Sequence, residues 1–405
     1  DITPAQSQLE VGPFNVSLGR PSPLQVHALI SSEAYKGSLR GDAGIRRLLQ
    51  SAQMLGFPSP QVNADGGSTV DLTFAGSWAD AHPKVLGTAQ LHAVQAAVRG
   101  VNGPISVARA NLVLSDNEVK VLNLNASAAG ALWHGNMRIP RPCGAANDCR
   151  LQFDLHSPEL SAVALNNNFN PASQKRSWYK FLSLGTEKPF FLLRTHASGK
   201  ITVDKLLLGD AECSHFAAGL RLDAGRVTLS GLSGELLAGT ISGDWEANFN
   251  SKPPEYKASG SLASVSLADV SELLHDGWID GTGNLKYELM ASGWSLRDLL
   301  DSAEVNTEFS VADSTFPHIV LTSTSGPLQA HVFSGTARLH RGEISFDGAK
   351  LNTAETVYTV SGTAALNGAL NLRLSGDGVA GFLLSGTVLE TRVSANPTTA
   401  ASLKP

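Results

Sequence analysis

Short stretches in which apolar and polar residues alternate make up most of the chain. Examples lie at residues 14–18, 69–74, 111–124, 226–232 and 370–376, and Gly, Asn, Asp or Pro interrupts the pattern between stretches. Alternation puts successive side chains on opposite faces of a strand, so each stretch has one apolar and one polar face. Because strands of parallel sheets are usually apolar on both faces, the pattern predicts an antiparallel sheet.

Helical spacing occurs in a few short segments. In residues 42–56, apolar residues recur at helical spacing behind Asp42, which we expect as the N-cap. Ser266 opens a second such segment, and Ser295 opens a third with Asp298 three residues later, a variant capping box. Helices this short are marginal alone. We therefore hypothesise that such a helix covers the apolar side of the sheet where the sheet turns.

Internal repeats extend the pattern. Residues 112–137 align with residues 220–245 without a gap, and a third copy at residues 337–364 follows with a two-residue insertion. A repeat of this length contains several strands, so we expect one sheet extended by repetition, each repeat resting on its neighbours. The predicted fold is all-β with a few short helices: an elongated, curled antiparallel sheet that forms a groove.

The repeats divide the chain into four predicted parts. The first contains the helix near residues 42–56, and the last is the C-terminal repeat. Their bounds are 1–102, 103–197, 198–302 and 303–405.

Composition excludes several classes of partner. The chain has 405 residues, a net charge of −5 and no basic tract, which argues against nucleic acid. No run of 18 or more apolar residues is present, so we expect no membrane-spanning helix. The chain starts with Asp, so we expect a mature or excised piece whose signal or anchor lies upstream.

Two cysteines suggest that the chain resides in an oxidising compartment. Cys143 and Cys149 lie between strand-like stretches, where a disulfide would contribute roughly 2 kcal/mol. Such a bridge is typical of an oxidising compartment such as a periplasm. The alternative is two unpaired loop thiols. Cys213 has no nearby partner and is expected to be a small buried side chain.

The chain carries little that indicates chemistry. It contains no nucleophile, nucleotide-binding or metal-binding motif, and its 11 His residues are scattered. We therefore expect no enzyme activity, no metal and no cofactor. What remains is the apolar face, which is either the core of a closed sandwich or barrel or the lining of an open trough. The candidate lining residues are Leu112, Leu114, Val119, Val121, Leu220, Leu222, Val227, Leu229, Leu339, Ile344 and Phe346.

An open trough would suit lipid. Moving an acyl chain through water exposes its methylene groups, at a cost of about 0.8 kcal/mol for each. A chain of about sixteen carbons therefore costs on the order of 12 kcal/mol, which a continuous apolar surface would largely remove.

Residues 281–300, 334–376 and 383–397 carry a family resemblance. They combine a strand, a Gly-Ser/Thr-Leu-x-Asp-Leu-Leu type segment, Gly-rich strands and a closing "LLSGTVLETRVSANP". In these motifs the chain resembles the AsmA-like family of bacterial envelope proteins, which includes the larger TamB. The N-terminal half, with "GSLRGDAGIRRLLQSAQMLG", is similar to the repeating unit of the same family.

The resemblance implies a repeating β-groove that transfers phospholipid between the inner and outer membranes or serves outer-membrane assembly. It also implies a periplasmic location, tethered to the inner membrane by an N-terminal helix, which we expect to lie upstream of this chain. The implied partners are phospholipid acyl chains, the membrane and outer-membrane assembly proteins. The family offers no catalytic residues to carry over.

Two alternatives remain. A scaffold or chaperone could hold assembling outer-membrane proteins by adding a strand to an exposed sheet edge. A carbohydrate-active solenoid enzyme is disfavoured because it needs clustered carboxylates on adjacent strands and a shorter repeat.

Overall fold

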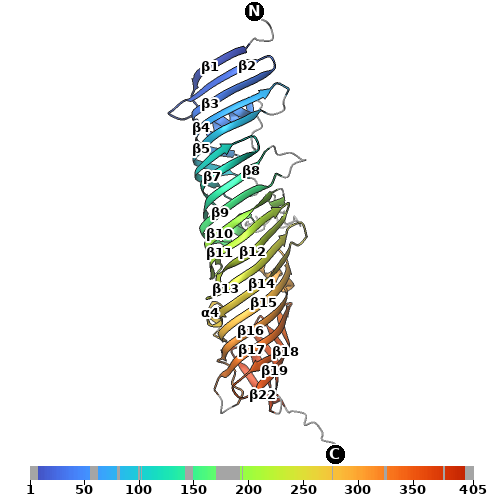
Figure 1. The fold of residues 1–405 in the computed structure, drawn as a ribbon. Helices are drawn as coiled ribbons and strands as arrows, with labels where there is room; N and C mark the ends of the chain where they lie inside the picture. Colours follow the sequence, from blue (N-terminus) through green and yellow to red (C-terminus); the bar gives the residue numbers. More distant parts are fainter. Residues whose placement is uncertain are drawn as a thin grey trace, which may run out of the picture. The chain divides into compact units, whose positions relative to one another are not determined.

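Strands dominate the protein. The structure, a computed structural model, describes residues 8–54, 63–79, 83–98, 101, 103–141, 149–169, 192–193, 195–275, 277–322, 326–376 and 379–396. Strands make up 70% of these residues and helices 9%, and the 22 strands form a curled, unclosed sheet. The predicted fold class, all-β with a few short helices, is confirmed (Figure 1).

The chain divides into two compact units. The N-terminal unit comprises residues 1–204 and 220–224, and the C-terminal unit comprises residues 205–219 and 225–405. Residues of β10 (His196–Leu208) and β11 (Ala211–Asp223) belong to both. The N-terminal unit contains β1 (Gln8–Val16), β2 (Leu24–Ser31), β3 (Ala34–Gly44), α1 (Ile45–Met54), β4 (Asn63–Ser77), β5 (Lys84–Ala97), β6 (Ile105–Leu114), β7 (Glu118–Ala128), β8 (Ala131–Pro140), β9 (Leu151–Ser161) and α2 (Ala162–Phe169).

In its described residues, the C-terminal unit is likewise built from strands with two short helices. It contains β12 (Arg226–Leu236), β13 (Gly239–Asn248), β14 (Glu255–Ser266), α4 (Leu267–Leu273), β15 (Asp280–Ser292), α5 (Leu296–Ser302), β16 (Glu304–Phe316), β17 (Leu328–His340), β18 (Glu343–Asn352), β19 (Val357–Ala365), β20 (Ala369–Gly376), β21 (Gly381–Thr387) and β22 (Thr391–Asn396). In both units, each strand pair whose register is described joins strands adjacent in sequence and is antiparallel.

In the N-terminal unit the register sorts side chains onto two different faces. On one face, a row of directly opposed residues crosses nine strands and is apolar throughout: Val16, Leu24, Gly41, Val70, Ala89, Leu112, Val121, Met137 and Phe153. On the other face, the adjacent row is mostly polar: Asn15, Gln25, Arg40, Asp71, Thr88, Val113, Lys120, Arg138 and Gln152. We call these the apolar face and the polar face.

The C-terminal unit repeats this division. One row of its apolar face crosses β12 to β20: Leu229, Trp245, Ala258, Leu289, Val305, Leu339, Ile344, Ala364 and Leu370. The neighbouring row on its polar face consists of Thr228, Glu246, Lys257, Met290, Glu304, His340 and Glu343. The period-2 alternation of the sequence is therefore kept in register from strand to strand.

The sequence repeats correspond to a repeated bulge. The register shifts at the same place in each copy, between Val121 and Leu124 in the first and between Leu229 and Leu232 in the second. The bulged residue has a positive φ in all three copies: Asn123, Gly231 and Gly348. In the first two copies its backbone N–H donates to a side chain of the next strand, at 3.1 Å and 2.9 Å. Bulges bend a strand and raise its twist, so their repetition curls the sheet.

Glycines also recur at one place in the strand that follows each bulge. Gly135, Gly243 and Gly362 have φ values of +148°, +155° and +120°, which residues with a Cβ rarely adopt. A Cβ on Gly243 would also collide with the backbone carbonyl of Ser259 on the neighbouring strand. Each repeat therefore uses glycine where two backbones approach closely.

Two of the helices lie against the apolar face. Leu48 of α1 packs against a buried cluster of Leu24, Val70 and Ala89, and Figure 1 shows α1 behind the strands of its unit. Leu267 of α4 packs against the buried core of the C-terminal unit. For α1 and α4, these contacts agree with the hypothesis that a short helix covers the apolar side of the sheet.

Two of the three expected helix caps are present. The Ser266 hydroxyl accepts a hydrogen bond from the backbone of Asp269, and Ser295 forms a full capping box with Asp298. The expectation for Asp42 was wrong. Asp42 lies in β3, where its carboxylate accepts a 2.7 Å hydrogen bond from the Thr69 hydroxyl, and α1 begins three residues later. Asp42 does not cap α1 because it lies within β3, where it opposes Thr69 of β4.

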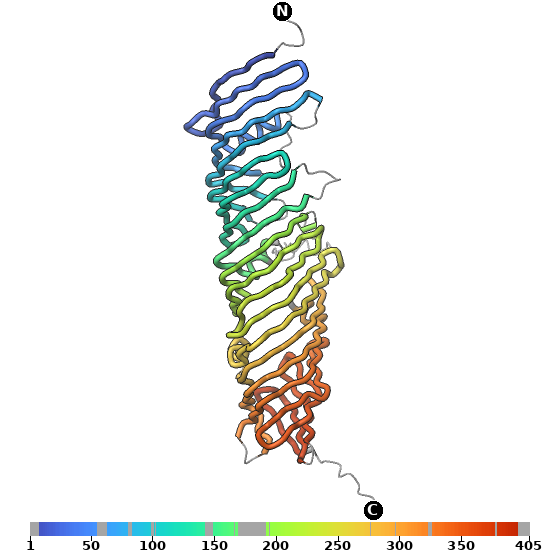
Figure 2. The backbone as a smooth tube through the Cα atoms, in the orientation of Figure 1, coloured from blue at the N-terminus to red at the C-terminus, as the bar shows by residue number. Residues whose placement is uncertain are grey.

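The C-terminal strands enclose a core. Its buried members come from the segment before β15 and from β16 to β21: Ile279, Phe316, Leu328, Ala330, Ala349, Leu351, Tyr358, Val360, Leu374, Phe382 and Leu384. Figure 2 shows the last strands of this unit curling behind the strands that precede them. In this part of the unit, the apolar face is covered by the sheet itself.

Candidate functional site

The predicted lining residues lie on the apolar faces. Those with a described register are Leu112, Leu114, Val119, Val121, Val227, Leu229, Leu339, Ile344 and Phe346, and each is opposed by an apolar residue or glycine. Leu220 and Leu222 continue, at every second residue of β11, from the buried Phe216 and Ala218. The alternation thus brings the predicted residues together by face.

Exposure distinguishes this surface from a sealed core. All eleven predicted lining residues are half-buried. In contrast, Leu374 and Leu384 in the C-terminal core are each 2% exposed. Half-buried apolar side chains in continuous rows form a surface to which an apolar ligand still has access.

Phe346 lies at the boundary between the two environments. Its ring centroid is 5.9 Å from that of Phe309 and 6.0 Å from that of Phe333, and all three pack against the C-terminal core. The sequence analysis left open whether the apolar face is a closed core or an open trough, and it did not indicate that this part of the chain is closed. Phe, Leu and Tyr recur between residues 309 and 384, and the core residues Phe316, Leu328, Tyr358 and Leu374 are among them.

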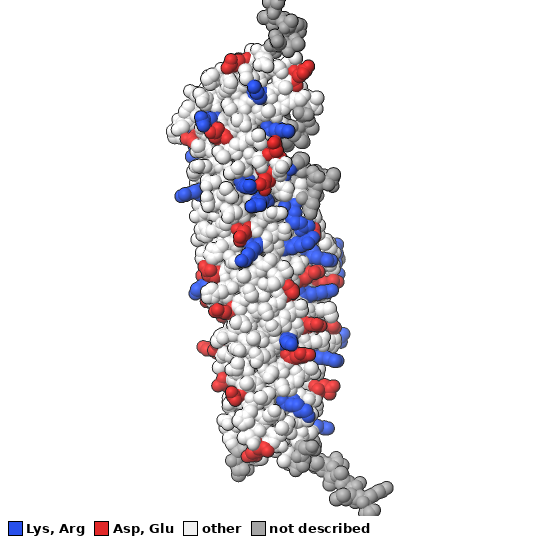
Figure 3. Space-filling model, viewed as in Figure 1, with Lys and Arg blue, Asp and Glu red and all other residues white. Residues whose placement is uncertain are grey.

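The polar faces are solvated. Arg40 and Asp71 pair across two strands at 2.7 Å, and Arg226 pairs with Glu246 at 3.5 Å. These pairs are exposed, and exposed ion pairs contribute little to stability. Figure 3 shows Lys and Arg interspersed with Asp and Glu on the face in view. This face is suited to water rather than to a specific ligand.

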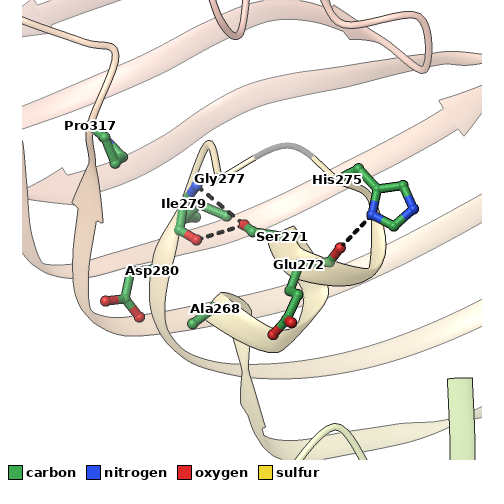
Figure 4. A pocket seen from close by; sticks show the side chains of 8 residues that line it. All are labelled: Ala268, Ser271, Glu272, His275, Gly277, Ile279, Asp280 and Pro317. Atoms are coloured by element: carbon green, nitrogen blue, oxygen red, sulfur yellow. Dashed lines mark hydrogen bonds between the residues drawn. The ribbon is translucent and has the colours of Figure 1, made fainter.

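A shallow pocket of about 450 Å³ lies beside α4 (Figure 4). The hydroxyl of the buried Ser271 donates to the backbone carbonyl of Ile279 at 2.7 Å, and His275 makes a 3.1 Å hydrogen bond with the backbone carbonyl of Glu272. Ser271 and His275 in this pocket therefore bind neighbouring backbone. Their arrangement ties α4 to the segment before β15, which is a structural role.

A charged cluster surrounds Asp223 in the N-terminal unit. The carboxylate accepts hydrogen bonds from Arg221 at 3.1 Å, His196 at 2.8 Å and Arg150 at 3.4 Å. Hydrogen bonds from Arg221 and then from His196, with a smaller effect of Arg150, hold the pKa of Asp223 below its ordinary value of 3.8. The cluster joins the segment before β9 to β10 and β11, so we assign it a structural role.

The Asp223 cluster predicts a pH-dependent stability. A carboxyl whose folded pKa is depressed stabilises the fold above its ordinary value and loses that contribution as pH falls through the folded pKa. Asp223→Asn should therefore lower the unfolding midpoint near neutral pH, and the difference from wild type should shrink below pH 3.8. Denaturant unfolding over a pH series measures this. A difference that persists undiminished at the acid end would contradict it.

The cysteines are in two states. Cys149 is disulfide-bonded, and Cys143, its predicted partner, lies outside the described residues. Cys213 is free and 2% exposed, and burial raises the pKa of its thiol. A buried thiol with a raised pKa is a poor nucleophile.

Over the part of the chain that the structure describes, no group of three His, Cys, Asp or Glu side chains could hold a metal ion. No helix in that part is long and apolar enough to cross a membrane. Comparisons with protein-family models, curated proteins and solved structures find no match. The apolar face is therefore the feature on which a functional argument can be based.

Proposed function

We propose that this chain is an AsmA-like protein of a bacterial envelope that carries phospholipid acyl chains on its apolar face. The observation that supports the proposal is the continuity of the apolar rows, which cross nine strands in each unit without a charged residue. A row of this kind allows an acyl chain to stay in apolar contact while it moves from strand to strand.

The energetics favour such a role. Each methylene group that leaves water for this surface contributes about 0.8 kcal/mol. Neighbouring positions along a row are chemically similar, so an acyl chain meets no deep energy minimum that would hold it in one place. The proposal requires no catalysis, because the barrier to lipid transfer through water is the exposure of the acyl chain.

The proposal also includes a location. We place the chain in the periplasm, tethered to the inner membrane as in the family that it resembles, with a role in phospholipid transport to the outer membrane. The disulfide at Cys149 supports an oxidising compartment.

The proposal predicts that the protein binds phospholipid. Delipidated protein incubated with phospholipid vesicles and re-purified should retain lipid, because the predicted lining residues of the apolar face are half-buried and remain accessible. Native mass spectrometry and organic extraction measure the lipid per protein chain. A protein of similar size without an apolar groove serves as the control for carry-over. Recovery of no more lipid than in this control would refute the proposal.

A second candidate function is strand addition at β1. Among the strand pairs whose register is described, β1 pairs with β2 alone. Leu9 and Phe14 on this strand are 62% and 45% exposed. An exposed edge can accept a strand of an assembling outer-membrane protein. Pro13 weakens this candidate, because it removes one hydrogen-bond donor from β1. The second candidate would be favoured if the chain binds an unfolded β-barrel protein and added lipid does not displace that protein.

A further inference from the structure

A second pocket, of about 530 Å³, lies at the strand ends of the N-terminal unit. Three segments supply an arginine or a carboxylate to it. Arg20 comes from the connection between β1 and β2, Arg46 and Arg47 come from the first turn of α1, and Asp65 comes from β4. The pocket therefore holds three guanidinium groups and one carboxylate.

The positive charge in this pocket is only partly neutralised. Arg46 pairs with Asp65 at 3.2 Å. Within the described ranges of the chain, neither Arg20 nor Arg47 forms a salt bridge. On the polar face, by contrast, Arg40 is paired with a carboxylate. Two cations without a carboxylate partner in one pocket favour binding of an anion.

Two glycines let the unpaired guanidinium groups approach the backbone. A Cβ on Gly67 would collide with the guanidinium of Arg20, which lies directly against this glycine and would have to shift. A Cβ on Gly19 would lie 3.2 Å from Nε and 3.3 Å from Cζ of Arg47. The two guanidinium groups are thus seated against main chain.

The pocket borders the apolar face. Leu18 lines the pocket and also packs against the buried cluster of Leu24, Val70 and Ala89. Leu48, one turn after Arg46 and Arg47 on α1, packs against the same cluster. Leu18 and Leu48 cover this cluster, and the half-buried Leu112, which packs against it too, continues the apolar face beyond α1. A molecule with an anionic end at the arginines would reach the accessible apolar face there.

We infer that this pocket binds the phosphate group of a lipid headgroup while the acyl chains of that lipid lie on the apolar face. Guanidinium groups match phosphate because they donate two parallel hydrogen bonds to its oxygens. The headgroup assignment rests on the proposed function, whereas the binding of phosphate by the arginines does not.

Isothermal titration of the whole chain with two probes tests the inference. The probes are inorganic phosphate and dihexanoyl phosphatidic acid, which adds two short acyl chains to the same phosphate chemistry. Wild-type protein should bind the lipid probe more tightly than inorganic phosphate. Arg20→Gln and Arg47→Gln should each weaken both probes about tenfold, because each removes a charge-assisted hydrogen bond.

Two further variants separate position from charge. Gly67→Ala should weaken both probes less than Arg20→Gln does, because the added methyl group shifts the guanidinium while its charge stays at the pocket. Arg138→Gln, an exposed arginine of β8 outside the pocket, should leave both affinities within about twofold.

Each remaining outcome overturns a defined part of the inference. If neither probe binds, or if the arginine variants bind both probes as wild type does, the phosphate site is refuted while the lipid-carrying function can still hold. If both probes bind equally and only through the arginines, the site is a phosphate site and the headgroup assignment is refuted. Retention of phospholipid from vesicles by the double variant Arg20→Gln/Arg47→Gln at the wild-type level also refutes that assignment.

Discussion

A Val227→Asp substitution is expected to reduce the phospholipid that the protein retains by about tenfold or more while leaving it folded. Val227 is half-buried on the apolar face of the C-terminal unit and is opposed by Ala247. A carboxylate at this position would have to lose its hydration against an acyl chain, and burying an unpaired charge costs several kcal/mol. Val227 lies two residues before Leu229 on the same face, so the charge disrupts apolar contact with an acyl chain that lies across β12.

The matched control for this prediction lies one residue earlier. Arg226 is on the polar face, where it pairs with Glu246. Arg226→Gln should retain lipid at the wild-type level, since it removes only an exposed ion pair. Lipid per chain by native mass spectrometry, with circular dichroism to verify folding, decides the comparison. Equal lipid retention by Val227→Asp and wild type would contradict the prediction.

The N-terminal unit allows a stricter version of the same comparison. Leu114 on the apolar face and Val113 on the polar face are adjacent in β6. Leu114→Glu should reduce lipid retention, whereas Val113→Glu introduces the same side chain opposite Lys120 and should not. Equal effects of the two substitutions would show that added charge, not its face, controls lipid binding.

A Leu374→Ala substitution is expected to destabilise the C-terminal unit by about 2–5 kcal/mol. Leu374 is 2% exposed in the C-terminal core, where it is opposed by Val360 on β19 and Phe382 on β21. Removing its side chain loses apolar burial and leaves a cavity between three strands that are held in register. Hydrogen exchange of β19 to β21, followed by mass spectrometry, measures the free energy of opening in this core.

The control for core destabilisation is also a leucine. Leu366, in the turn after β19, is 52% exposed. Leu366→Ala should change the free energy of opening by no more than about 0.5 kcal/mol. If Leu374→Ala lowered the free energy of opening as little as this control does, the covered part of the apolar face would be loosely packed. The distinction between a closed core and an open apolar surface would then be wrong.

The substitutions on the apolar face and those in the arginine pocket test different parts of the proposal. Val227 and Leu114 test whether acyl chains use the apolar face, whereas Arg20 and Arg47 test whether a phosphate group is held at its border. A protein that loses lipid through Val227→Asp but keeps it through the arginine variants would carry acyl chains without recognising the headgroup. The two proposals can therefore fail separately.

Alternation along the chain was enough to predict the strands and their two faces, because the period of two is a property of each strand alone. The candidate lining residues could be chosen on this basis, since every second residue of a strand shares a face. The repeats were also readable from sequence, and the equivalent bulges at Asn123, Gly231 and Gly348 are their structural counterpart. The capping box of Ser295 and Asp298 was predictable because it involves residues only three apart.

Only the tertiary structure decided where the apolar face is open and where it is covered. Curvature accumulates over many bulges and glycine bends, and it determines that the last strands of the C-terminal unit close over a core around Leu374. The role of Asp42 depended on Thr69 of a neighbouring strand, which local pattern does not reveal. The arginine pocket likewise joins Arg20, Arg47 and Gly67 from separate segments. Local sequence sets which face a side chain takes, whereas contacts between distant segments set what that face meets.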